Sequence, residues 1–145
     1  MPSSITHTYF GMDVYNELDN IIKDKIKNSL GYFKTFCQGP DVLFFYHLFI
    51  GKSAKEVNKL GSTVHRMDTN KFFINTIKYI IDNNLSNDSS VMSFLYGYMC
   101  HYFLDSTCHP FIYYKTGNLI KGDKSTYKYS GIHADMEFFI DKYMI

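Results

Sequence analysis

The chain has 145 residues and a formal net charge of +1, with 15 basic and 14 acidic residues spread along its length. Because it contains no basic block and no arginine-rich stripe, its composition argues against tight binding to duplex nucleic acid. Hydrophobic residues make up 46% and include 13 Phe and 13 Tyr. A single domain over residues 1–145 is therefore expected, long enough to bury one aromatic-rich core.

No targeting or membrane segment is expected. The N-terminal segment MPSSITHTYFGMD lacks a basic region followed by an apolar run, so it does not predict a secretory signal. The longest nearly unbroken apolar stretch, Val42 to Ile50, is too short to span a bilayer. Reduced thiols are expected because the three cysteines, Cys37, Cys100 and Cys108, form no CxxC motif. We therefore expect a cytoplasmic protein.

The spacing of apolar residues is helical almost throughout and predicts an all-α bundle. Thr6 is a candidate cap for a first helix that runs through Leu18, and the apolar stripe continues to Ile26. Pro40 suits the first turn of a further helix, which would place Asp41 near its N-terminus.

The middle of the chain predicts two more helices. Ser53 and Glu56 form a candidate capping box for a short helix that ends at Gly61. His65 then falls in a connector, and a clearly amphipathic helix follows over residues 72–81. His47, among Phe and Leu residues, is interpreted as a core residue.

Residues 91–108 form the most apolar segment and predict the central helix. Pro110 disfavours helical geometry at the preceding residue, so His109 is expected at or just past the end of this helix. Residues 114–130 are predicted to form a surface loop, and a last helix should start around Gly131. The amphipathic pattern is still running at residue 145, so a truncated C-terminus is an alternative to a natural end.

The most informative pattern is a set of histidines and acids at helical spacing. His101, Asp105 and His109 stand four residues apart, which keeps side chains on one face of a helix. His133 and Glu137 repeat this spacing downstream, whereas three candidates stand alone upstream: His7, Asp41 and His65. Zn²⁺ prefers this mixture of imidazole and carboxylate ligands. We interpret the chain as a helical bundle around a multinuclear zinc site.

A simpler interpretation competes with a metal at each position. A single histidine on an apolar helix is usually a core residue, and His133 with Glu137 could be an ordinary pair on an exposed face. Asp105 argues otherwise, because a carboxylate buried in this helix is costly without a partner. No Lys or Arg occurs between Ile80 and Tyr114, so a divalent cation is the better partner. A thiolate ligand from Cys100 or Cys108 stays open.

Taken together, these residues resemble the zinc-dependent phospholipase C family, which shares its fold with the fungal single-strand nucleases. The resemblance covers essentially the whole chain. It rests on the order and rough spacing of an N-terminal His, a GPD-type Asp, an isolated His, HxxxD followed by HP, and HxxxE: His7, Asp41, His65, His101, Asp105, His109, His133 and Glu137.

The resemblance implies two to three zinc ions in an all-α fold. One ion would be held by His65, His101 and Asp105, and a second by His109, His133 and Glu137. The third would be held by His7 and Asp41, with Asp105 as a bridge to the first ion. Family members complete that third site with the free N-terminal amine. Here Pro2 would supply the amine after removal of Met1.

The family chemistry is hydrolysis of a phosphodiester by water activated on zinc. Asp41 is our candidate general base. Departures from the family pattern concern the substrate. Val42 replaces an aromatic residue, His109 follows Asp105 more closely than in the secreted enzymes, and the N-terminus lacks an acidic headgroup contact. A choline pocket is therefore not expected.

Three functional hypotheses follow. The leading one is a zinc-dependent phosphodiester hydrolase that resembles phospholipase C and acts on a phospholipid or a smaller phosphodiester. The second is a nuclease-like phosphodiesterase that stacks single-stranded nucleic acid on Tyr and Phe rings. The third is a non-catalytic zinc-binding protein. The sequence does not indicate an oligomeric state.

Overall fold

The computed structural model describes residues 4–46 and 52–144. Pro2 and His47 lie outside these ranges. The described residues form helices and no strand, which confirms the predicted all-α class. Their elements are α1 Ser4–Glu17, α2 Asn20–Ile26, η1 Lys27–Ser29, α3 Leu30–Phe36, η2 Gly39–Phe45, α4 Lys52–Val64, α5 Thr69–Asp82, α6 Ser89–Thr116, η3 Lys124–Thr126 and α7 Lys128–Tyr143, where η marks a 3₁₀-helix.

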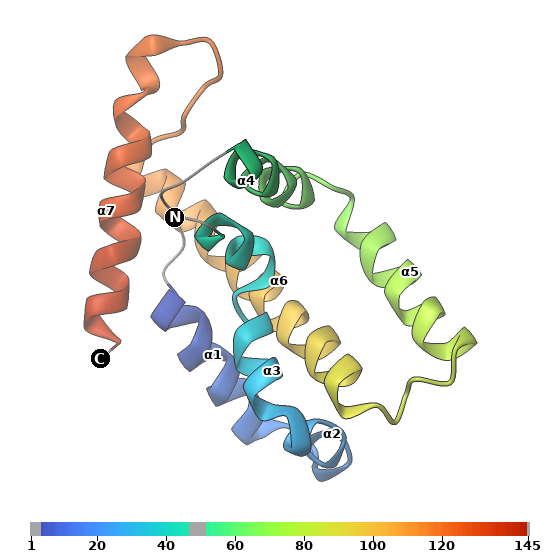
Figure 1. The fold of residues 1–145 in the computed structure, drawn as a ribbon. Coiled ribbons are helices and arrows are strands. Elements are labelled where there is room, and N and C mark those ends of the chain that lie inside the picture. The colour runs from blue at the N-terminus through green and yellow to red at the C-terminus, as the bar shows by residue number, and fades with distance from the viewer. Residues whose placement is uncertain (1–3, 47–51, 145) are drawn as a thin grey trace.

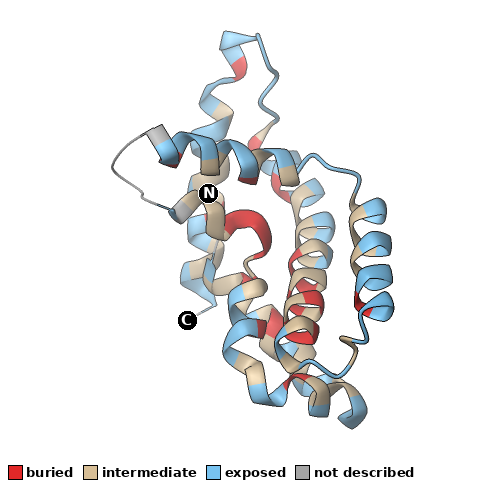
Figure 2. Ribbon diagram, turned by 45° about the vertical axis from the view of Figure 1, so that its right-hand side comes forward, coloured by how far each residue is buried: buried red, intermediate tan, exposed pale blue. Residues whose placement is uncertain are grey.

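Helix α6 is the axis around which the other elements are arranged. It contacts α1, α2, α3 and α7 along its 28 residues (Figure 1). The side chain of Asp88 starts the helix by accepting hydrogen bonds from the backbone N–H groups of Ser90 and Val91. Buried positions concentrate along α6 and at the start of η2 (Figure 2). The apolar composition of residues 91–108 therefore correctly predicted the central helix.

The core forms where α3 packs against the N-terminal half of α6. Phe33 and Cys37 are fully buried, and they pack with Leu95 and Cys100 of α6. Gly97 lies at the closest approach of the two helices, because a Cβ atom there would be 2.6 Å from the backbone oxygen of Phe33. The absence of a side chain at this position thus sets the distance between α3 and α6.

The expectation that α6 ends at His109 is wrong. Pro110 lies inside the helix, which continues to Thr116. Proline removes one backbone hydrogen bond from a helix interior, but one face of the turn beyond it is buried, with Ile112 at 4% and Thr116 at 5% exposure. Packing of this turn offsets the lost hydrogen bond. As a result His109 stays on the helix.

The start of α1 is stabilised by the far end of the chain. Thr6 was expected to cap this helix, but α1 begins at Ser4. The Asp141 carboxylate, from α7, accepts hydrogen bonds from Ile5 N at 3.3 Å and from Thr6 N and Thr6 Oγ1, both at 2.7 Å. A carboxylate is favourable at a helix N-terminus because it satisfies free N–H groups and complements the helix dipole. This contact holds α1 against α7.

Other boundaries differ from the sequence expectations by a few residues. A second helix, α2, begins after Asp19, whose side chain accepts from Ile21 N. The segment after Pro40 is a 3₁₀-helix, with Asp41 near its start as expected. Helix α4 extends past Gly61 to Val64, and α7 begins at Lys128.

Helix α5 lies at the edge of the bundle. The predicted amphipathic helix is confirmed over Thr69–Asp82, and Ile80 and Phe73 face the core. Its other face is mostly exposed (Figure 2). None of the described helices combines the length and apolar character needed to cross a membrane.

We expect Gly97→Ala to lower the melting temperature by roughly 5 °C, because overpacking a close helix contact costs about 1–3 kcal/mol. Thermal unfolding followed by circular dichroism measures this. Gly131→Ala is the matched control, since a Cβ atom there meets nothing within 4 Å. That substitution should stabilise α7 by about 0.5–1 kcal/mol. Equal melting temperatures for the two variants would contradict the close α3–α6 contact.

Candidate metal centre

The described candidate ligands converge on one side of α6. His101, Asp105 and His109 project from successive turns of this helix. They face His7 on α1, Asp41 on η2, His65 after α4, and His133 and Glu137 on α7. Continuation of α6 through Pro110 is what brings His109 into the row. All eight candidates present in the described residues thus lie in neighbouring groups.

Asp105 is at the middle of the centre. Its Oδ1 atom lies 3.3 Å from His7 Nε2 and 3.4 Å from His109 Nδ1, while its Oδ2 lies 3.4 Å from His101 Nε2. The rings of His7 and His101 stack with their centroids 4.6 Å apart. The side chain of Asp105 is 22% exposed, so it is less buried than its apolar sequence context suggested.

Asp41 forms a second group with His65 and His101. Its Oδ1 atom lies 2.8 Å from His65 Nε2, and its Oδ2 lies 3.9 Å from His101 Nδ1. Gly39 makes this approach possible, because its φ is +53° and a Cβ atom there would overlap the His101 ring. The glycine therefore lets the turn before η2 lie against His101.

The third group connects α6 to α7. His133 Nε2 lies 3.0 Å from Glu137 Oε1, and His109 Nε2 lies 3.4 Å from the same oxygen. The His109 and His133 rings stack at 5.4 Å. Glu137 is only 6% exposed. The ordinary exposed pair considered for His133 and Glu137 is thus not what the structure contains.

The three groups differ in part from the sets that the resemblance implied. His109, His133 and Glu137 come together as expected. His7, however, lies with His101 and Asp105, and Asp41 lies with His65 and His101. The difference arises because α1 carries His7 over the middle of α6, whereas the turn at Gly39 directs Asp41 toward His65. His101 lies between the two groups, with one ring nitrogen facing each carboxylate.

The hydrogen bonds of two histidines leave the second nitrogen of each ring available to bind a cation. His65 Nδ1 lies 2.9 Å from the carbonyl oxygen of Gly61, and His109 Nδ1 lies 3.0 Å from that of Asp105. A carbonyl only accepts, so each Nδ1 carries a proton. In a neutral ring, Nε2 then directs its lone pair at a carboxylate. A proton or a metal ion is needed between Nε2 and the carboxylate oxygen. In metal-binding histidines, the ring nitrogen that does not bind the metal commonly makes such a backbone hydrogen bond.

Electrostatics of the centre follow from the same contacts. The hydrogen bond to Asp41 raises the pKa of His65, and that to Glu137 raises the pKa of His109. Burial lowers the pKa of His101 to about 4, so this ring is neutral near pH 7. Burial alone would raise the pKa of Asp105, but the hydrogen bond from His7 and the nearby histidine charges lower it overall. Asp105 is therefore a carboxylate.

Several buried polar atoms of the centre have no hydrogen-bond partner among the described residues. These include His7 Nδ1, Asp41 Oδ2, His101 Nδ1 and His133 Nδ1. Leaving such atoms unpaired costs about 1–3 kcal/mol each. These atoms lie around one set of nitrogen and oxygen donors. That donor set fits a bound divalent cation of intermediate hardness, such as Zn²⁺. None of the three groups found in the described residues includes a cysteine, and Cys37 and Cys100 contact each other instead.

A hollow of about 440 Å³ opens beside the centre. Its wall includes His65, His101, Asp105 and His109, together with residues that the sequence analysis did not single out: Arg66, Tyr98, Tyr102 and Tyr113. Arg66 could have been noticed, because it is the only arginine in the sequence and directly follows His65. The three tyrosines could not have been singled out in the same way, because the sequence contains 13 Tyr and nothing marks these three. The hollow therefore combines candidate metal ligands, aromatic walls and one guanidinium.

Comparison with known proteins agrees with this geometry. No curated protein and no solved structure gives a significant match. A family model described as zinc dependent phospholipase C matches residues 6–145, which includes all eight convergent residues and nearly the whole chain. The chain belongs to the zinc-dependent phospholipase C family.

Proposed function

We propose that the chain is a zinc-dependent phosphodiester hydrolase that acts on a phospholipid or a smaller phosphodiester. The observation that carries this proposal is the convergence of eight imidazole and carboxylate side chains, four of which line one hollow. Membership of the zinc-dependent phospholipase C family supports it. The chemistry of the hollow suits a phosphate, because Arg66 adds a positive charge next to the candidate metal ligands.

We propose that two to three zinc ions bind to the three groups. One ion would lie between His7, His101 and Asp105, and another beside Asp41 and His65. The third would be held by His109, His133 and Glu137. Pro2 remains our proposed source of an additional amine ligand.

Zinc would supply Lewis-acid stabilisation of the phosphate and a bound water of lowered pKa. The side chains prepare the site for this chemistry. The Gly61 carbonyl fixes the tautomer of His65, and the neutral His101 ring keeps a lone pair available. We propose that Asp41 accepts a proton from the attacking water at Oδ2, the oxygen without a hydrogen-bond partner among the described residues.

Single-stranded nucleic acid is a second candidate substrate. Tyr98, Tyr102 and Tyr113 line the same hollow, and tyrosine rings are suitable platforms for stacked bases. The near-neutral charge of the chain and its single arginine give less attraction for a long polyanion than such proteins usually have. A phospholipid or small phosphodiester is thus the better-supported substrate.

Asp105→Asn should reduce the zinc content per chain measured by elemental analysis, because Asp105 contacts three histidines. A ligand present at a thousandfold excess over its Kd stabilises by about 4 kcal/mol, which corresponds to roughly 10 °C for a chain of this size. Chelation by EDTA should therefore lower the melting temperature of the native protein by about that amount, and that of Asp105→Asn by much less. Asp135→Asn, at an exposed position of α7, is the control and should behave like the native protein. An unchanged zinc content in Asp105→Asn would contradict the ligand role.

The zinc-loaded protein should hydrolyse bis-p-nitrophenyl phosphate, and dispersed phosphatidylcholine and single-stranded DNA complete a substrate panel. The three activities are measured by the release of p-nitrophenol, of a soluble phosphate ester and of nucleotides, respectively. Preference for DNA would favour the nuclease-like alternative. A fully loaded protein without turnover on any of them would instead indicate the non-catalytic zinc-binding protein.

Asp41→Asn should lower kcat for bis-p-nitrophenyl phosphate, expressed per bound zinc, by about 10²–10⁴-fold, the usual contribution of a general base. An amide cannot accept the proton. Some zinc should also be lost, but less than in Asp105→Asn, because Asp41 contacts two histidines and Asp105 contacts three. Asp135→Asn again serves as the control. If Asp41→Asn loses zinc in proportion to activity, Asp41 acts as a ligand only.

A further inference from the structure

We propose that a groove between α5 and α6 binds an acyl chain of the lipid whose phosphodiester is at the metal centre. This inference rests on the proposed function and deepens it by assigning a second subsite to the substrate. The groove has a volume of about 670 Å³, which makes it larger than the 440 Å³ hollow at the metal centre.

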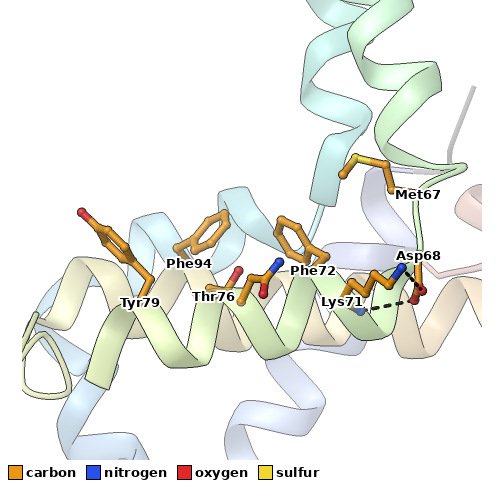
Figure 3. A pocket seen from close by; sticks show the side chains of 8 residues that line it. Met67, Asp68, Lys71, Phe72, Thr76, Tyr79 and Phe94 are labelled. Carbon is orange, nitrogen blue, oxygen red and sulfur yellow. Dashed lines mark hydrogen bonds and ion pairs between the residues drawn. The ribbon is translucent and has the colours of Figure 1, made fainter. Parts of the chain in front are cut away.

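The groove is apolar along most of its length. Phe72 and Phe94 lie at its middle, Tyr79 lies at one end, and the Lys71–Asp68 pair lies at the other, with Met67 nearby (Figure 3). The only charged side chains in the lining are these two, and they neutralise each other at 3.8 Å. An uncharged, hydrocarbon-rich occupant is therefore favoured over an ionic one.

The groove adjoins the hollow of the metal centre next to Tyr98. The Tyr98 ring belongs to the wall of the central hollow, and its centroid lies 4.8 Å from Phe72 and 5.8 Å from Phe94 in the groove. The connector after α4 contributes to both spaces, because His65 and Arg66 line the hollow while Met67 and Asp68 line the groove. We infer that a ligand with its phosphate in the hollow extends past Tyr98 and the connector into the neighbouring groove.

The dimensions and charges fit one lipid molecule. The groove follows α5 from Asp68 to Tyr79, a helical rise of roughly 16 Å, which accommodates an extended acyl chain of medium length. Among the described lining residues, the unpaired basic side chain lies at the end near the centre, at Arg66 in the wall of the hollow, since Lys71 is paired with Asp68. The polar, anionic part of a phospholipid would therefore meet the metal centre and its basic edge, and the hydrocarbon would meet Phe72 and Phe94.

The test is calorimetric titration of the zinc-loaded protein with butyl, hexyl and octyl phosphate, which share one anionic group and differ only in chain length. In the native protein, we expect affinity to rise about two- to fourfold per methylene, the increment for burying hydrocarbon. Thr76→Phe, which fills the groove, should abolish this dependence, so that butyl, hexyl and octyl phosphate bind with similar affinity. Ile74→Phe is the matched control, because Ile74 is 63% exposed on the same helix and does not line the groove. Asn75→Phe, at the exposed rim, is a second filling variant should Thr76→Phe fail to fold.

Two results would overturn the inference: an affinity that does not depend on chain length in the native protein, or the same dependence in both filling variants. Light scattering tests a second copy as the occupant. A native dimer that Thr76→Phe makes monomeric would also overturn the acyl-chain assignment. Hydrolysis of bis-p-nitrophenyl phosphate, which has no alkyl chain, tests the proposed function separately. Its absence would reject the hydrolase, while the chain-length series would still decide the groove.

Discussion

The charge balance at the middle of α6 constrains the rest of the structure. Asp41 and Asp105 are drawn into the bundle, and within the described residues every ion pair found for them involves a histidine. Histidines near pH 7 compensate carboxylates only when protonated, and burial keeps His101 neutral. Bound cations would satisfy both carboxylates and imidazoles at once. Because metal binding would then contribute to the folding free energy, the arrangement of α1, η2, α6 and α7 would depend on it.

Local rules of sequence correctly predicted the all-α class and the helical spacing of several candidate ligands. Four-residue spacing placed His101, Asp105 and His109 on one face of a helix, and it paired His133 with Glu137. Such spacing is visible because it depends only on helix geometry. The general rule for residues before proline failed at His109, since packing of the following turn outweighs it. Local preference is a weak constraint when one face of the next turn packs against the rest of the protein.

Long-range placement could not be predicted from periodicity. Which carboxylate meets which histidine depends on how α1 and the turn at Gly39 lie against α6. Nothing near His7 in the sequence encodes Asp105 as its neighbour, 98 positions away by their residue numbers. The same holds for the lining of the hollow and groove, where Tyr98, Phe72 and Phe94 differ from other aromatic residues only by their neighbours in space.

The hydrogen bonds between Asp141 and the start of α1 have a consequence for the order of assembly. Contacts between residues so distant in sequence form late, because a large loop of chain must first be closed. Asp141 lies one helical turn after Glu137, so the same docking event that caps α1 also brings the α7 candidate ligands to α6. During synthesis on the ribosome, this group of candidate ligands cannot assemble before α7 has emerged. Tight zinc capture would therefore report that α1 and α7 have docked.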